Sequence, residues 1–143
     1  MRRLPLLVWL PLLVAGGCSR GSSTPQAVVA ADPLASMQLD GGKRWAADAH
    51  TRQSIAAMTA AMQSAARDPS PAGTTALGNQ LRELGHQLIA GCTMTGPAHD
   101  ALHVYLGVLL PDFHRMSGSD AEAAKLARSE AAAVLARFDH YFQ

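Results

Sequence analysis

The residues best suited to chemistry are one cysteine and two histidines in the second half of the chain. His99 and His103 are four positions apart, a spacing that puts both imidazole rings on one side of a helix. Cys92 precedes them by a short turn that contains Met94. Thiolate and imidazole suit Zn²⁺, and the same groups with a thioether suit Cu(I). Cys92, His99 and His103 are therefore the predicted ligands of a copper or zinc site.

Other interpretations of these residues stay open. Cys92 falls near an apolar stripe, and a free cysteine often serves as a small buried hydrophobic residue. As a nucleophile it would need an activating base, which His99 or His103 could provide, and a third group to orient that base. No sequence motif supplies the third group. We therefore predict no catalytic residue, and we expect that the protein is not an enzyme.

Haem binding is a lesser alternative, because some exported four-helix bundles are cytochromes. Covalent haem needs Cys-x-x-Cys-His, which the sequence lacks. Non-covalent haem in a b-type bundle resembles an inward Met on the first helix and an inward His near the end of the last. Met58 is available, whereas His140 points away from the apolar stripe of its helix. We expect no cofactor, and copper or zinc at Cys92, His99 and His103 is the alternative.

Four amphipathic helices must position these side chains. Apolar residues at helical spacing predict helices over residues 43–67, 75–91, 97–116 and 119–143. The second carries a seam of four leucines: Leu77, Leu81, Leu84 and Leu88.

Three local features set the bounds and shape of these helices. Pro97 suits a first helical position, and Pro111 predicts a kink within the third helix, since the apolar pattern keeps its phase across it. Ser119 and Glu122 form a capping box at the start of the fourth helix. Short connections between four such helices indicate an antiparallel bundle.

Several short motifs in the helical region resemble a family of small proteobacterial exported proteins, some of them labelled DnrO-like. The motifs are Trp45-x-x-Asp48 with Arg52, then Cys92 with Asp100-x-x-His103, and finally Phe138-Asp139-His140. Relatives often carry Met at the position of Ile55 here. The activity of the family is not established, so the resemblance implies no catalytic residue. It does imply that Cys92, Asp100 and His103 belong to one recurring set.

Composition narrows the class of protein. The chain has 12 Lys and Arg against 11 Asp and Glu, and aromatic residues make up only 5%. A nearly neutral chain without a clustered basic face excludes a nucleic-acid partner. Abundant alanine with few aromatic residues favours helices packed through small side chains and disfavours a β-sandwich.

The N-terminus carries a targeting signal. Met1-Arg2-Arg3 is followed by an apolar stretch over residues 4–14, which is too short to span a membrane and has the length of a signal-peptide core. Residues 14–18, Val-Ala-Gly-Gly-Cys, resemble the lipobox of bacterial lipoproteins, with Ala in place of the more usual Leu three positions before the cysteine. The resemblance implies cleavage before Cys18 and acylation of its thiol, with palmitate among the chains.

These observations combine into one prediction. Residues 1–17 form a lipoprotein signal peptide, residues 18–42 a flexible tether rich in Ser, Gly, Ala and Pro, and residues 43–143 the all-α, antiparallel four-helix bundle. We expect a lipid-anchored, periplasm-facing protein of the cell envelope that acts by binding. Ser19 follows the cysteine, which implies the outer rather than the inner membrane under enterobacterial sorting rules. The membrane is the predicted partner, and the sequence identifies no protein partner.

Overall fold

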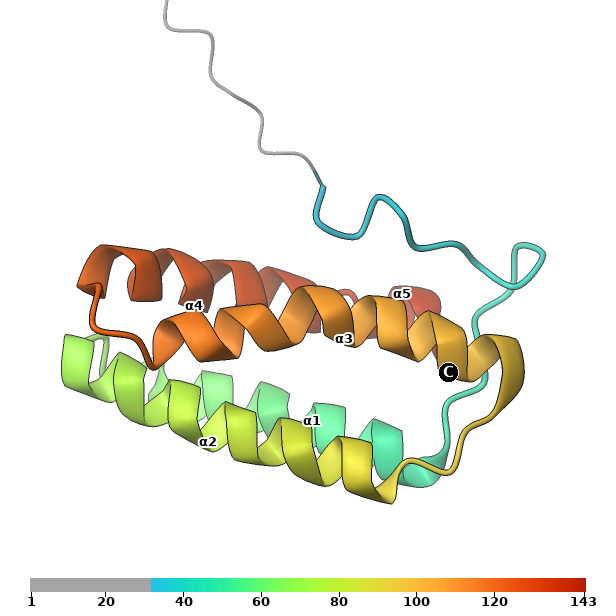
Figure 1. Ribbon diagram of the computed structural model, residues 1–143, viewed down its shortest axis with the longest axis horizontal. Coiled ribbons are helices and arrows are strands. Elements are labelled where there is room, and N and C mark those ends of the chain that lie inside the picture. Colours follow the sequence, from blue (N-terminus) through green and yellow to red (C-terminus); the bar gives the residue numbers. More distant parts are fainter. Residues whose placement is uncertain (1–31) are drawn as a thin grey trace, which may run out of the picture. The chain divides into compact units, whose positions relative to one another are not determined.

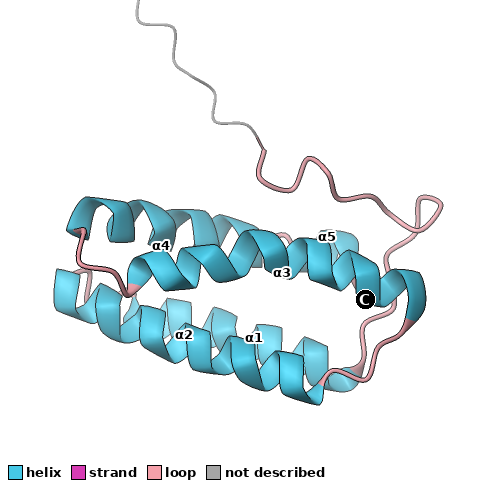
Figure 2. Cartoon of the chain, in the orientation of Figure 1, coloured by secondary structure: helices cyan, strands magenta, loops and turns pink. Residues whose placement is uncertain are grey.

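The computed structural model describes residues 32–143, which form an antiparallel four-helix bundle with a short fifth helix (Figure 1). The helices are α1 (Ala49–Ala65), α2 (Pro71–Gly91), α3 (Gly96–Met116), α4 (Ala121–Leu135) and α5 (Phe138–Tyr141). The predicted signal peptide, Cys18 and the first part of the tether lie outside the described residues. The predicted all-α bundle is confirmed: the described residues contain no β-strand, only two isolated bridges (Figure 2).

Each long helix packs against its neighbours in sequence, and α4 closes the bundle against α1. The side chains that fill the centre come from all four helices and repeat at helical spacing. Fully or almost fully buried members include Ile55, Met58, Leu77, Leu81, Leu88, Leu102, Leu109, Phe113, Met116, Ala127, Ala131 and Val134. Leu84, a predicted member of the seam on α2, is only partly buried. Within residues 32–143, no helix is long and apolar enough to cross a membrane.

Two glycines on α2 allow the helices to approach closely. A Cβ atom on Gly78 would lie 2.8 Å from the Cβ of Met116 and from the backbone nitrogen of Ser117. A Cβ atom on Gly85 would lie 2.8 Å from a methyl group of Leu110. Both distances are shorter than van der Waals contact. The neighbours of Gly78 are a Cβ atom and backbone atoms, so only glycine permits this approach of α2 to the end of α3, whereas the methyl group beside Gly85 is the end of a flexible side chain and can shift.

The first helix begins later than the sequence predicts. Residues 43–47 are not helical, and Trp45 and Ala47 pair with the last residues of the chain: the Trp45 N–H donates to the Tyr141 carbonyl at 2.7 Å, and the Gln143 N–H donates to the Trp45 carbonyl at 2.9 Å. The indole N–H of Trp45 donates to the Gln38 carbonyl. The two backbone bonds of Trp45 join segments almost a hundred residues apart, and helical periodicity alone could not indicate them.

The described end of the predicted tether also differs from expectation. Residues 32–42 contain no helix or strand, yet Leu34 is fully buried and Met37 is 8% exposed. The Leu34 N–H donates to the Asp32 carboxylate, and Asp32 forms an ion pair with Arg137 beside α5. Burial of two apolar side chains makes this segment part of the domain. The packed domain therefore includes Leu34 and Met37, which the sequence assigns to the tether.

Helix α2 begins earlier than the sequence predicts, because a capping residue and a proline precede the predicted start. Ser70 accepts a hydrogen bond from the Gly73 N–H, and Pro71 occupies the first helical position, so α2 begins four residues before the predicted start at 75.

The α3 helix continues through Pro111, as the apolar phase predicts. The missing N–H of Pro111 leaves the carbonyl of Gly107 without its intrahelical bond. Gly107 is exposed, so water can reach that carbonyl.

The prediction that Ser119 caps the fourth helix is wrong. Asp120 is the cap: its carboxylate accepts hydrogen bonds from the N–H groups of Glu122 and Ala123, both at 3.0 Å. A carboxylate at this position also interacts favourably with the helix dipole, which favours Asp120 over the serine hydroxyl one residue earlier. The fourth helix ends at Leu135, and Phe138 and Tyr141 are buried from the separate helix α5.

The buried leucines should dominate stability. We expect Leu109→Ala, at a fully buried position on α3, to lower the free energy of unfolding by about 2–5 kcal/mol because it leaves a cavity. Leu126→Ala is the matched control on α4; its side chain is 55% exposed, and its substitution should cost less than about 0.5 kcal/mol. Urea unfolding followed by circular dichroism measures both. Equal effects of the two substitutions would contradict this description of the core.

The cap of α4 gives a second test. Asp120→Ala should lower the free energy of unfolding by about 0.5–2 kcal/mol, because two N–H groups of the first turn lose their acceptor. Ser119→Ala should have little effect. The same urea titration compares the pair, and a larger loss for Ser119→Ala would show that the helix begins one residue earlier.

Candidate functional site

The connection between α2 and α3 brings the predicted ligands together. Helix α2 ends at Gly91, with Cys92 as its C-terminal cap, and α3 starts at Gly96. Gly96 has a φ of 64°, a backbone conformation that side chains disfavour, so glycine allows the chain to turn back within four residues. The turn sets Cys92 beside the first turn of α3, where His99 and then His103 follow.

Cys92, His99 and His103 form a chain of contacts rather than a ring. The Cys92 Sγ atom lies 3.7 Å from His99 Nδ1. On the other side of the same imidazole, His99 Nε2 and His103 Nε2 are 2.8 Å apart, a hydrogen-bond distance at which one N–H donates to the other nitrogen. The two imidazole rings meet edge to face. His99 therefore lies between the thiol and the second imidazole.

These three side chains border a small apolar cavity of about 40 Å³. Its other lining residues are Leu88, Ile89, Leu102 and Leu106. Cys92 and His99 are partly buried, His103 is exposed, and Ile89 is 50% exposed at the rim. The site is thus a shallow pit at the surface of the α2–α3 pair, and it is open to solvent on the side of His103.

The spacing of Cys92 and His99 fits two ligands of one metal ion. With a Zn–S bond of about 2.3 Å and a Zn–N bond of about 2.0–2.1 Å, a tetrahedral angle separates the two donor atoms by about 3.6 Å. The observed separation of Sγ and Nδ1 is 3.7 Å. The thiol and this imidazole nitrogen could therefore bind one ion without rearrangement of the backbone.

His103 does not fit as a third ligand in the same arrangement. Its Nε2 atom faces the opposite nitrogen of His99, and 2.8 Å is shorter than the separation of about 3.3 Å expected for two imidazole nitrogens on one tetrahedral ion. When His99 Nε2–H donates to His103, the lone pair of His99 Nδ1 faces Cys92. His103 would then act from outside the ligand set and hold His99 in the tautomer that can bind metal. Among residues 32–143, no three His, Cys, Asp or Glu side chains converge on one point.

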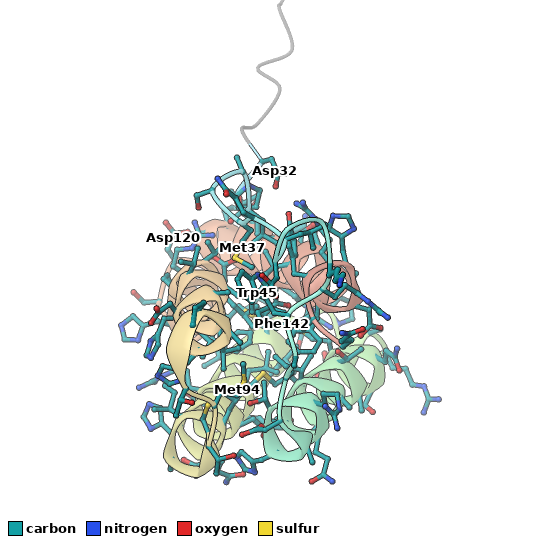
Figure 3. All side chains as sticks on the ribbon, turned by 90° about the vertical axis from the view of Figure 1, so that its right-hand side faces the viewer. Asp32, Met37, Trp45, Met94, Asp120 and Phe142 are labelled. Atoms are coloured by element: carbon teal, nitrogen blue, oxygen red, sulfur yellow. The ribbon has the colours of Figure 1, made fainter. Side chains whose placement is uncertain are left out.

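Thr51 reaches the site from α1, and sequence reasoning missed it. The side chain is fully buried, and its hydroxyl lies 3.6 Å from Met94 Sδ and 4.0 Å from Cys92 Sγ. Figure 3 shows Met94 at the end of the bundle, below Trp45 and Phe142. Thr51 is separated from the sulfur atoms by about forty residues in sequence, so only its polar character inside an apolar stripe could have pointed to it.

The carboxylate of Asp48 holds this end of the bundle in place. One oxygen accepts from the Thr51 N–H at 2.6 Å and caps α1. The other accepts from both the N–H and the hydroxyl of Thr93 at 2.7 Å, in the connection between α2 and α3. Burial alone would raise the pKa of Asp48, but the hydrogen bonds from Thr51 and Thr93 outweigh it and hold the pKa well below its usual range.

The remaining motif residues lie elsewhere. Asp100 is exposed and borders a separate hollow with Trp45 and Val104, so the structure does not bring it to Cys92. The guanidinium of Arg52 donates to the Ala47 carbonyl at the start of α1. Met58 is fully buried, whereas His140 is exposed on α5. The pair considered for haem therefore has no inward imidazole from α5.

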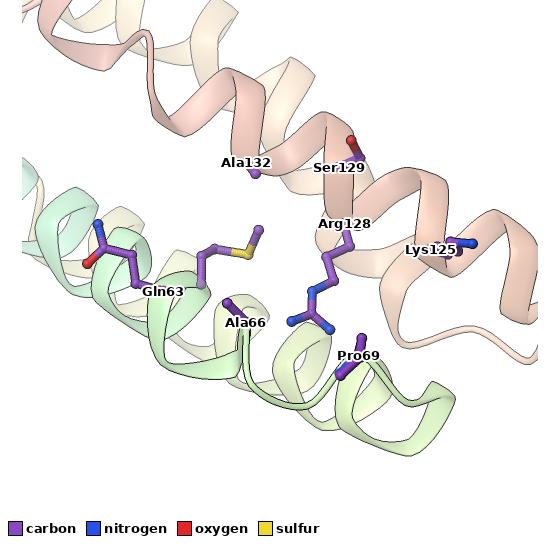
Figure 4. A pocket seen from close by; sticks show the side chains of 8 residues that line it. Gln63, Ala66, Pro69, Lys125, Arg128, Ser129 and Ala132 are labelled. Atoms are coloured by element: carbon purple, nitrogen blue, oxygen red, sulfur yellow. The ribbon is translucent and has the colours of Figure 1, made fainter.

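A second concavity lies between the end of α1 and the middle of α4 (Figure 4). It is mainly apolar, with a volume of about 470 Å³, and Met62, Ala66 and Ala132 line it together with Arg128. The guanidinium of Arg128 is already occupied, because it donates to the Ala65 and Asp68 carbonyls and to the Thr74 hydroxyl. Arg128 therefore links the end of α1 to α4, and this concavity is a groove between two packed helices of the bundle.

Comparison with protein-family models, with curated proteins and with solved structures gives no match for this chain.

The Asp48 carboxylate should make the free energy of unfolding depend on pH in the acidic range. Because its pKa is lower in the folded state, it stabilises the fold above its unfolded pKa of about 4, and this contribution declines as the pH falls below that value. Asp48→Ala should lower the free energy of unfolding at pH 7 by about 1.5–3 kcal/mol, since hydrogen bonds to a charged acceptor are lost. Urea unfolding between pH 2 and 7 should show the difference from wild type narrowing towards pH 2. A constant difference would contradict the role of the charge.

Proposed function

We propose that this protein is a lipid-anchored helical bundle of the cell envelope that acts by binding rather than by catalysis. The sequence of residues 1–18 carries the proposal: a positive start, a short apolar stretch and small residues before Cys18. Each buried methylene of an acyl chain adds about 0.8 kcal/mol of membrane affinity, so the several chains of a bacterial lipoprotein give a permanent anchor. Ser19 favours the outer membrane, with the bundle facing the periplasm.

The mass of the mature protein tests whether it carries the lipid anchor. The protein purified from membranes should begin at Cys18 and carry the added mass of its acyl chains, palmitate among them. Cys18→Ala should leave the protein without lipid, either released from the membrane or still joined to its signal peptide. Intact-mass spectrometry distinguishes these products. A mature wild-type protein of unmodified mass would refute the lipid anchor.

A second candidate function is binding of copper or zinc at the α2–α3 connection. The single observation that favours it is the separation of 3.7 Å between Cys92 Sγ and His99 Nδ1, which matches two ligands of one ion. A soft thiolate beside an imidazole suits Cu(I) and Zn²⁺ better than a hard cation. In this proposal Cys92 and His99 bind the ion, and His103 supports His99 through its second nitrogen.

Metal titration separates these roles. Under reducing conditions, wild-type protein should bind Zn²⁺ or Cu(I) with a Kd below about 10 μM, and Cys92→Ser or His99→Ala should abolish binding. His103→Ala should weaken it by roughly 10- to 100-fold, the usual effect of losing an outer hydrogen bond to a ligand. His86→Ala, at an exposed position on α2, is the control and should change nothing. Equal affinity of the wild-type and His99→Ala proteins for both metals would exclude this site.

A further inference from the structure

The α2–α3 site has the composition of half a zinc centre. Structural zinc ions take four ligands in a tetrahedron, and two cysteines with two histidines are a common set. One chain presents one thiol and one imidazole nitrogen at the required separation, while His103 occupies the other nitrogen of His99. Two of the four ligand positions on the ion would therefore be left unfilled by this chain.

The position of the pair allows a second chain to fill them. Cys92 and His99 are only partly buried, and they border a shallow pit with the exposed side chains of His103 and Ile89 around it. A tetrahedral ion with two sulfur and two nitrogen ligands has a two-fold axis. A symmetric dimer with its axis through the ion would therefore contribute the same residue pair from each copy.

We propose that one zinc ion joins two copies of this protein through Cys92 and His99 of each, forming a centre with two thiolates and two imidazoles. The proposal rests on the metal-binding function proposed above and adds the identity of the partner, a second copy of the chain. Ile89, 50% exposed in the single chain, would be covered where the two α2–α3 pits face each other. His103 of each copy would remain outside the ligand set, bonded to His99.

Native mass spectrometry of the exported, purified full protein in detergent with a reductant tests the proposal. One measurement gives both the number of chains and the number of zinc ions. We expect a dimer with one zinc ion after incubation with zinc chloride, and monomers after chelation. X-ray absorption at the zinc edge should show two sulfur and two nitrogen neighbours.

Two matched substitutions separate the contact surface from the ligands. Ile89→Arg adds a positive charge beside the ion and should raise the dissociation constant of the zinc-dependent dimer by roughly tenfold or more, because the charge would be buried at the contact. Leu126→Arg introduces the same group at an equally exposed position on α4 and should have no effect. Both positions face solvent, so the fold should survive, and circular dichroism checks that it does.

Each result has a distinct meaning. A monomer that binds one zinc ion tightly would overturn the paired centre and leave the metal-binding function intact. Failure of the wild-type protein to bind zinc below about 10 μM would overturn the zinc function together with the pairing. A dimer that persists after chelation, or that Cys92→Ser leaves unchanged, would show that the contact does not depend on the ion.

Discussion

The end of the bundle that carries Cys92 and His99 is held together by one carboxylate, that of Asp48. Asp48 caps α1 through the Thr51 N–H and holds the α2–α3 connection through Thr93. Thr51, fixed by the same cap, contacts the sulfur atoms of Cys92 and Met94. A residue of a third helix thus contacts the Cys92 thiol on another side from His99, and the ionised Asp48 acceptor gives its own bonds to Thr51 and Thr93 more strength than neutral partners would.

Glycines on α2 explain how closely α2 and α3 approach, and aromatic side chains fill the end of the bundle where α4 meets α5. Glycines on α2 admit α3 at positions where a Cβ atom would collide with Met116 or Leu110. Aromatic residues are scarce, and Tyr105, Phe138 and Phe142 gather into a single cluster of contacting rings. The Tyr105 hydroxyl donates to the Val134 carbonyl, near the point where α4 ends and α5 begins. Helices α2 and α3 are therefore close at these glycines, and aromatic rings pack together where α4 ends and α5 begins.

Helical periodicity predicted the four long helices because their apolar stripes are local properties of the chain. It failed where distant segments decide the structure: Trp45 and Ala47 pair with residues 141–143, and Leu34 enters the core from a segment with the composition of a tether. The proximity of Cys92 to His99 followed from a short turn between two helices. Whether His103 meets the His99 nitrogen that faces Cys92 or the opposite one depends on the rotation of a single ring, which spacing cannot specify.

The extended pairing at residue 45 gives the domain a built-in optical reporter. Trp45 is the only tryptophan among residues 32–143, its indole is bonded to the Gln38 carbonyl, and its backbone is paired with Tyr141 and Gln143. Tryptophan fluorescence of this part of the chain, excited selectively over Tyr105 and Tyr141, therefore originates at a single point, where three separate segments converge. Emission will follow the opening of that junction, while far-ultraviolet dichroism follows the helices. Local detachment and global unfolding can thus be distinguished in one sample without a label.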